Sequence, residues 1–214
     1  MREIGIQYAA PMVRSILEDR KLVTRRTVKG EIPAGAVRAV FDQWSPGRAH
    51  AWRWLDQHGA PIGKPFRCPY GVAGDRLWVR EAWRASLAFE LTKPSEITAG
   101  TPLRYAAGGG DLPAFNAGKH RPGMFMPRWA SRITLEVTGV ACERLQDITH
   151  AQAIAEGIEP VGKRWRHYFF PQDDGEAWEF PVNSFASLWA SLNGEESWEA
   201  NPWVFAISFR RITP

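Results

Sequence analysis

Residues 132–140 place the strongest constraint on the fold, because apolar and polar side chains alternate there almost without exception. Ile133, Leu135 and Val137 share one side of this pattern. Side chains of a β-strand point alternately to opposite faces, so the spacing predicts a strand with one apolar face. It is the clearest strand in the chain.

Other strands are predicted to be shorter, and helices to be few. The predicted strands cover residues 4–8, 23–28, 77–84, 103–106 and 203–209. One helix is predicted to begin at Pro11, and others to cover residues 36–43, 151–156 and 182–192. About five or six strands with flanking helices and long loops favour an α+β fold, a small mixed β-barrel, over a doubly wound sheet.

Segments rich in Gly, Pro and Trp interrupt these elements at residues 29–73, 85–124 and 159–181. We interpret them as insertions in a single domain that covers residues 1–214. A chain of 214 residues with 44% hydrophobic content is large enough for a real core. Residues 49–60 are too polar and too rich in Trp to assign to an element.

The sequence predicts a cytoplasmic protein without membrane contact, cofactor or metal. Cys68 and Cys142 lie far apart without a C-x-x-C spacing, which favours neither a zinc site nor a disulfide framework. No signal-like segment follows the N-terminal Met, and no window approaches the roughly 20 apolar residues of a membrane span. His150 and His167 lack partners at metal-ligand spacing.

Charge and aromatic content point weakly toward nucleic acids. The net charge is +4 and the basic residues are mostly Arg, whose planar fork pairs with phosphates and stacks on bases. Among the 11 Trp residues, those at 78 and 83 alternate with Arg side chains in a pattern that suits base stacking. A plainer interpretation places most of the Trp residues in the core.

A candidate active site lies at residues 16–26, where a helical apolar pattern ends in cationic and hydroxyl groups. Lys21, Thr24, Arg25 and Arg26 supply an amine, a hydroxyl and two guanidinium groups within six positions. These groups suit the binding of an anionic ligand and nucleophilic attack on an acyl carbon. We interpret the stretch as the floor of an active site.

Several stretches of the chain resemble the ASCH domain family, relatives of the PUA-like RNA-binding barrels. The first motif of that family is Gly-x-Lys-x-x-Glu/Thr-x-Arg, and Lys21, Thr24 and Arg26 match it, whereas Asp19 stands at the Gly position. An Asp tolerates the turn conformation that Gly favours better than most residues do. The remaining similar stretches are residues 74–81 and 203–211 and, as in the longer ASCH proteins of phages and prophages, residues 126–133 and 147–158.

The resemblance implies an activity for the Thr-bearing branch of the family. That branch is similar to the small bacterial N4-acetylcytidine amidohydrolases, which use a Lys, a Thr and a Glu. By motif these residues fall on Lys21, Thr24 and Glu156, the last on the predicted helix after Ile148 and Thr149. Thr24 is then expected to attack the amide carbonyl, with Lys21 as its base and Glu156 orienting Lys21 or relaying protons.

The expected ligand is a modified cytidine nucleoside or nucleotide, or a single-stranded nucleic acid. Arg128, flanked by Pro127 and Trp129, is expected to face a phosphate or a base edge. The residues predicted to bind the ligand are Arg25, Arg26, Glu81, Trp83, Arg128 and Trp129.

Each candidate also has a plainer interpretation. Lys21 and Arg26 suit solvated cations, Thr24 suits a β-branched strand residue, and Glu156 suits an exposed helix carboxylate. The Trp residues at 83 and 129 suit the core. Three functions therefore stay open, namely an N4-acylcytidine amidohydrolase, a non-catalytic RNA- or DNA-binding module, and a ribonuclease.

Overall fold

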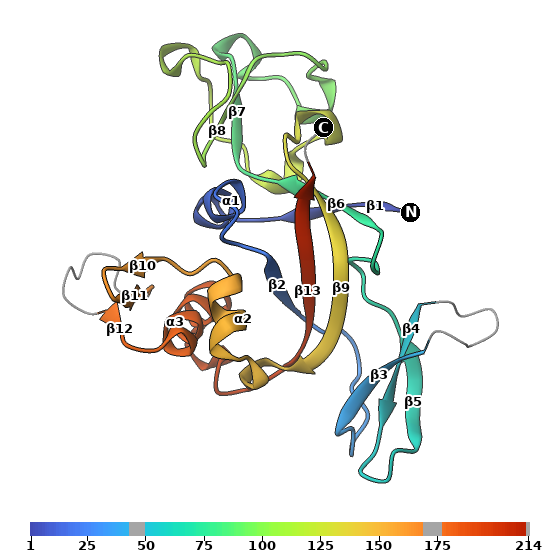
Figure 1. The fold of residues 1–214 in the computed structure, drawn as a ribbon. Coiled ribbons are helices and arrows are strands. Elements are labelled where there is room, and N and C mark those ends of the chain that lie inside the picture. The colour runs from blue at the N-terminus through green and yellow to red at the C-terminus, as the bar shows by residue number, and fades with distance from the viewer. Residues whose placement is uncertain (43–49, 169–176, 213–214) are drawn as a thin grey trace. The chain divides into compact units, whose positions relative to one another are not determined.

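The computed structural model describes residues 1–42, 50–168 and 177–212 of the chain (Figure 1). Within these residues the fold is α+β, with most of the regular structure in strands of open sheets and with few helices. The predicted fold class is confirmed at this level. The described residues contain more strands than the predicted barrel requires, because the segments predicted as insertions form strands of their own.

The chain divides into two compact units, each assembled from separate segments. The first unit comprises Met1–Asp19, Gly74–Glu136 and Arg210–Pro214, and the second comprises Arg20–Ala73 and Val137–Phe209. Two long strands, β9 (Thr134–Arg144) and β13 (Trp203–Ile212), contribute residues to both units. The single domain expected from the sequence stays a prediction.

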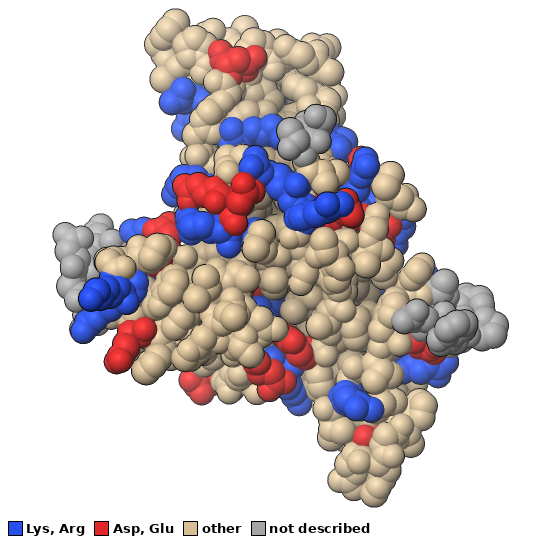
Figure 2. All heavy atoms as spheres, viewed as in Figure 1, with Lys and Arg blue, Asp and Glu red and all other residues tan. Residues whose placement is uncertain are grey.

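Charges of both signs are mixed on the face drawn in Figure 2. Lys and Arg side chains there lie among Asp and Glu side chains, and they do not form a surface of one sign. Among the residues described, no helix is long and apolar enough to cross a membrane.

The first unit combines a sheet edge with a separate hairpin. Strand β1 (Glu3–Gln7) pairs in parallel with β6 (Arg76–Arg80), and β6 pairs antiparallel with the first residues of β9. Helix α1 (Ala10–Leu17) begins with Pro11 in its first turn, as predicted. The hairpin consists of β7 (Trp83–Ala85) and β8 (Leu103–Tyr105).

The prediction of one strand at residues 77–84 is wrong, because the chain changes partners within it. Arg80, the last residue of β6, pairs with β1. Trp83 instead pairs with Tyr105 of β8 and with Arg121. Residues 85–124, predicted as a loop-like insertion, fold with β7 and β8 around a core of Trp83, Ala85, Ile97, Leu103, Met126 and Ala130.

The largest sheet has five strands in the order β1-β6-β9-β13-β2. The second unit contains β2, most of β13 and most of β9 from this sheet, together with two helices. Strand β2 (Val23–Thr27) runs antiparallel to β13, which neighbours β9. Helix α2 (His150–Ala155) and helix α3 (Pro181–Asn193) lie side by side (Figure 1). Three short strands, β10 (Pro160–Val161), β11 (Arg164–Arg166) and β12 (Ala177–Trp178), form an antiparallel sheet beside α3.

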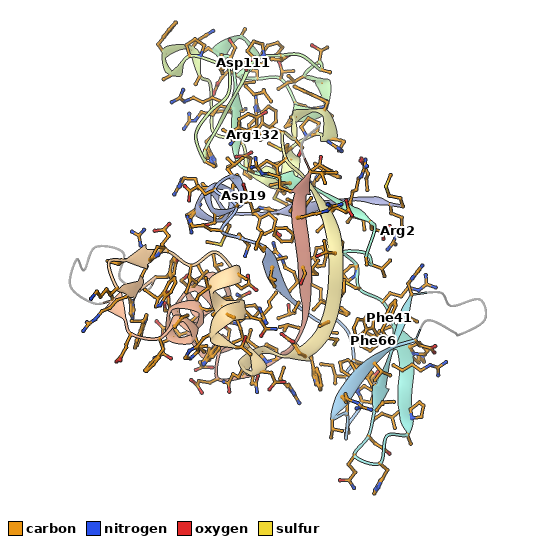
Figure 3. The ribbon with its side chains drawn as sticks, viewed as in Figure 1. Arg2, Asp19, Phe41, Phe66, Asp111 and Arg132 are labelled. Carbon is orange, nitrogen blue, oxygen red and sulfur yellow. The ribbon has the colours of Figure 1, made fainter. Side chains whose placement is uncertain are left out.

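A third sheet replaces the helix predicted at residues 36–43. It consists of β3 (Arg38–Asp42), β4 (Ala51–Leu55) and β5 (Pro61–Phe66), all antiparallel. The Trp-rich stretch that the sequence left unassigned is β4, whose Trp54 stacks on Phe66 with ring centroids 4.4 Å apart. Phe41 and Phe66 of this sheet are labelled in Figure 3. Pairing with β4 outweighs the weak helical preference of residues 36–43.

Seven short 3-10 turns complete the described structure. They are Leu87–Phe89, Pro94–Glu96, Ala114–Asn116, Gly123–Phe125, Arg128–Ala130, Leu145–Asp147 and Glu195–Ser197.

Asp19 adopts the left-handed conformation that the sequence motif implies for its position. Helix α1 ends at Leu17, and Asp19 follows with φ of 54°. Its carboxylate accepts hydrogen bonds from Arg211 Nε and Nη2 at 3.2 and 3.1 Å (Asp19 is labelled in Figure 3). Asp therefore occupies a backbone position that suits Gly, and an exposed ion pair anchors its side chain.

We expect Asp19→Gly to leave the free energy of unfolding within about 1 kcal/mol of the wild type. Relief of the left-handed backbone offsets the loss of an exposed ion pair. Asp19→Val should instead destabilise the protein by roughly 1–3 kcal/mol, because a β-branched residue is strained at positive φ. Urea unfolding of both variants measures the difference, and a Val variant as stable as the Gly variant would contradict this account.

Candidate active site

The backbone itself joins the two segments that carry Lys21 and Glu156. Lys21 lies just before β2 and Glu156 just after α2, and the two residues form an isolated antiparallel bridge. The N–H of Leu22 donates to the carbonyl oxygen of Ala155 at 2.7 Å. Residues 135 positions apart in the chain are therefore neighbours.

Local capping explains why α2 begins and ends where it does. Thr149 Oγ1 accepts a hydrogen bond from the N–H of Gln152, and Gln152 Oε1 accepts one from the N–H of Thr149. This reciprocal capping box satisfies two amide groups at the helix start. Gly157 with φ of 84° ends the helix directly after Glu156. The helix predicted at residues 151–156 is confirmed, with α2 covering His150–Ala155.

Glu156 belongs to a network of four charged side chains, and the other three are Lys21, Arg25 and Glu143. Lys21 Nζ donates to Glu156 Oε2 and to the Glu156 carbonyl oxygen, both at 2.7 Å. Arg25 Nη1 donates to Glu156 Oε1 at 3.2 Å, and Arg25 Nη2 donates to Glu143 Oε1 at 2.6 Å. Lys21 and Glu156 are each 3% exposed, which rules out the plainer interpretations as a solvated cation and an exposed carboxylate. We call Lys21, Arg25, Glu143 and Glu156 the buried charge network.

Burial changes the acidity of Lys21. The pKa of Lys21 lies below its ordinary value mainly because desolvation penalises the ammonium form. The Glu156 carboxylate opposes this shift in pKa, whereas the charges of Arg26 and Arg25 add to it. Lys21 therefore gives up its proton more readily than a lysine in water, while it stays hydrogen-bonded to Glu156.

Thr24 lies on β2 and is 4% exposed, directly opposite Ile207 of β13. Adjacent strand residues face opposite sides, so Thr24 shares a face with Arg26 and not with Arg25. The charge of Arg26, on the face that Thr24 occupies, contributes to the lowered pKa of Lys21. The contacts bring Lys21, Arg25 and Glu156 together, whereas Thr24, the neighbour of Arg25 on β2, faces the other side of that strand.

Two residues of this site were not predicted from the sequence. Glu143 on β9 lies 118 positions from Arg25, beyond the strand predicted at residues 132–140. Tyr70 lies with its ring centroid 5.9 Å from the Arg26 guanidinium carbon. Neither residue stands in a local motif, so only the folded chain identifies them.

The other predicted ligand-binding residues lie in the first unit, where each has a structural contact. Arg128 donates to Glu3 at 3.1 Å, and its guanidinium carbon is 5.8 Å from the ring of Trp78. Trp83 is 0% exposed and belongs to the core of that unit, and Trp129 packs against the same core. The core interpretation of both Trp residues is therefore confirmed.

Glu81, also predicted to bind the ligand, is held by an arginine of the same unit. Arg132 Nε and Nη2 donate to its two carboxylate oxygens at 2.8 and 3.0 Å. Burial raises the pKa of Glu81, and Arg132 opposes that shift. The pair satisfies a carboxylate that is 1% exposed.

Comparison of the chain with protein-family models, curated proteins and solved structures finds no match. The resemblance to the ASCH family consequently stays a prediction drawn from residues. In the described part of the chain, no three His, Cys, Asp or Glu side chains are grouped so that they could hold a metal ion.

We expect Glu156→Gln to destabilise the protein by roughly 3–5 kcal/mol, because it leaves Lys21 and Arg25 buried with a reduced counter-charge. Glu143→Gln is the matched control, since its side chain is 20% exposed and Arg25 keeps Glu156 as a partner. Urea unfolding of both variants measures the two losses. An equal loss, or a larger loss for Glu143→Gln, would contradict the central position of Glu156.

Proposed function

We propose that the protein is an amidohydrolase of the ASCH type that removes an acyl group from N4 of cytosine in an acylated cytidine nucleoside, nucleotide or RNA. The observation that carries this proposal is the buried contact of 2.7 Å between Lys21 Nζ and Glu156 Oε2. It joins Lys21, which matches the family motif, to Glu156, which was matched by its place on the helix after Ile148 and Thr149 and lies 135 positions away in the chain. A lysine with a lowered pKa, held in a fixed orientation, suits a general base.

The proposed reaction assigns a separate task to each residue. Neutral Lys21 accepts the proton of the Thr24 hydroxyl as the Thr24 oxygen bonds to the acyl carbon. The C–N bond then breaks, the N4 amine of cytosine takes the proton from Lys21, and an acyl ester remains on Thr24. Water attacks this ester, releases the acid and restores the hydroxyl. Glu156 holds Lys21 through its carboxylate and its carbonyl oxygen.

Arg25 has a positioning task in this proposal. Its side chain is fully buried and its guanidinium donates to Glu156 and Glu143, so it acts through Glu156 and not on a phosphate. Arg26, partly exposed on the face that it shares with Thr24, is the arginine of this strand placed to meet the ligand.

The PUA-like barrel is part of the same proposal. Two features support it, namely the left-handed conformation of Asp19 at the motif's Gly position and the pairing of the motif strand β2 with the C-terminal strand β13. The non-catalytic binding module and the ribonuclease remain the outcomes to be separated by experiment.

We expect the wild-type protein to release cytidine from N4-acetylcytidine, and we expect Thr24→Val to abolish that release. Val matches Thr in shape but lacks the hydroxyl, whereas Thr24→Ser keeps a hydroxyl and should retain activity. Lys21→Met should lower kcat/KM by about 10²–10⁴-fold through loss of the base. Chromatographic separation of cytidine from its acetylated form measures the reaction.

Thr27→Val is the matched control, because Thr27 is exposed on the same strand. Circular dichroism verifies that each variant is folded. Absence of release by the wild type, or unchanged release by Thr24→Val, would reject the hydrolase. RNA cleavage by the wild type would favour the ribonuclease.

The pH dependence of kcat/KM should rise with pH as Lys21 loses its proton, with a midpoint below the ordinary lysine pKa of about 10.4. Glu156→Gln removes the influence that raises the pKa of Lys21, so the rising limb should move to lower pH. Arg26→Gln removes an influence that lowers this pKa, so the limb should move to higher pH. Movement of both variants in the same direction would contradict Lys21 as the titrating base.

A further inference from the structure

A cavity of about 270 Å³ in the first unit is rich in cationic side chains. It lies at the β7–β8 hairpin and the glycine turn that follows β8. Its side-chain walls come from Trp83, Arg84, Arg104, Tyr105 and His120, and none of the described residues that line it is Asp or Glu. Arg84, Arg104 and His120 are all exposed, so their donor groups are accessible to a ligand.

The register of the hairpin forces the two arginines together. Arg84 and Arg104 are direct partners in the antiparallel ladder of β7 and β8. Side chains in such a pair stand about 4.5–5.5 Å apart at Cβ, and like charges at this spacing destabilise a hairpin. The pair therefore carries a cost that an anion between the two guanidinium groups would remove.

A third basic side chain, His120, comes from the other side of β7. Trp83 and Arg121 exchange both backbone hydrogen bonds, at 3.0 and 2.9 Å, in an antiparallel bridge. In that direction His120 is the residue that follows toward Arg84. Three neighbouring backbone segments thus present Arg104, Arg84 and His120 in one row.

Several other arginines of the same unit have carboxylate partners, whereas Arg80 and Arg121 donate to backbone carbonyl oxygens. Arg2 pairs with Asp75, Arg128 with Glu3 and Arg132 with Glu81 (Arg2 and Arg132 are labelled in Figure 3).

The arginine pair at the cavity departs from this pattern. Within the described residues no ion pair involves Arg84 or Arg104, and Arg84 Nη1 donates to the carbonyl oxygen of Gly118 at 2.8 Å. Asp111, the acidic group of the neighbouring turn, accepts the N–H of Leu103 at 2.9 Å. The guanidinium groups of the pair are therefore available to an external anion.

We infer that this cavity binds a phosphate group, carried by a mononucleotide or by a single-stranded nucleic acid. Phosphate oxygens accept hydrogen bonds from two guanidinium groups at once and neutralise the like-charged pair. Trp83 is 0% exposed and fixes β7 in the core of the unit, and the partly exposed ring of Tyr105 is held by Arg132, whose guanidinium carbon is 4.1 Å from the ring centroid. This inference is independent of the proposed hydrolase activity.

Thermal unfolding and calorimetric titration of the full chain test the inference with inorganic phosphate, cytidine monophosphate and a short single-stranded oligonucleotide, all at one ionic strength set with chloride. Each phosphate-bearing ligand that binds should raise the Tm of the wild type, and unphosphorylated cytidine should not raise it through this cavity. Arg104→Gln should be at least as stable as the wild type without phosphate, because it relieves the like-charge contact. Its affinity for the phosphate-bearing ligands should fall by about tenfold or more.

Arg38→Gln is the matched control, since it removes the same charge from an exposed position on β3. It should keep the wild-type response to phosphate, as should Thr24→Val, which separates this site from the hydrolase. Tighter binding of the oligonucleotide than of the mononucleotide identifies nucleic acid as the source, and the reverse order identifies free nucleotides. The inference is overturned if the wild type responds to none of the three phosphate ligands, or if Arg104→Gln and Arg38→Gln respond alike.

Discussion

The buried ion pair between Lys21 and Glu156 is the interaction on which the second unit depends. Two charges removed from water cost several kcal/mol each, and only close geometry with further hydrogen bonds offsets that cost. One carboxylate oxygen of Glu156 accepts a hydrogen bond from Lys21, and the other accepts one from Arg25. Glu143 accepts a further hydrogen bond from Arg25. Two cations and two carboxylates leave the network neutral in sum.

A neutral buried network is a costly way to stabilise a fold, because apolar residues of similar volume often do as well or better. In the proposed hydrolase, this network holds the general base. The same burial that makes the pair costly also lowers the pKa of Lys21, which is the property that a general base requires. Stability and proposed chemistry thus depend on one set of contacts.

At the hairpin of the first unit, charged side chains of the same sign face each other without a counter-charge among the described residues. Its other arginines mostly face carboxylates, whereas Arg84 and Arg104 face each other across β7 and β8. One unit thus encloses its charges among themselves, and the other leaves a like-charged pair exposed beside a cavity. The two arrangements suit different tasks, the first a proton transfer and the second the capture of an anion.

Local patterns predicted the elements whose signals lie within a few residues. The alternation at Ile133, Leu135 and Val137 predicted β9, Pro11 predicted the start of α1, and the pattern at residues 151–156 predicted α2. The motif selected Lys21 and a separate helix match selected Glu156, and these two residues lie in contact in the folded chain. These successes share one physical reason, since alternation, capping and fixed φ angles act over one or two turns of chain.

Contacts between distant segments determined the elements and the side-chain environments that the sequence did not predict. Residues 38–42 form a strand because β4 supplies a partner, and residues 77–84 divide because Arg80 and Trp83 pair with different strands. Strand pairing and register also decide the environment of the charged residues. They bury Lys21, bring Arg25 within hydrogen-bond distance of Glu143 and place Arg84 opposite Arg104. The energy of strand pairing depends on residues far apart in the chain, so a short stretch of sequence cannot predict it. The burial and the neighbours of the charged side chains are likewise set only when the chain has folded.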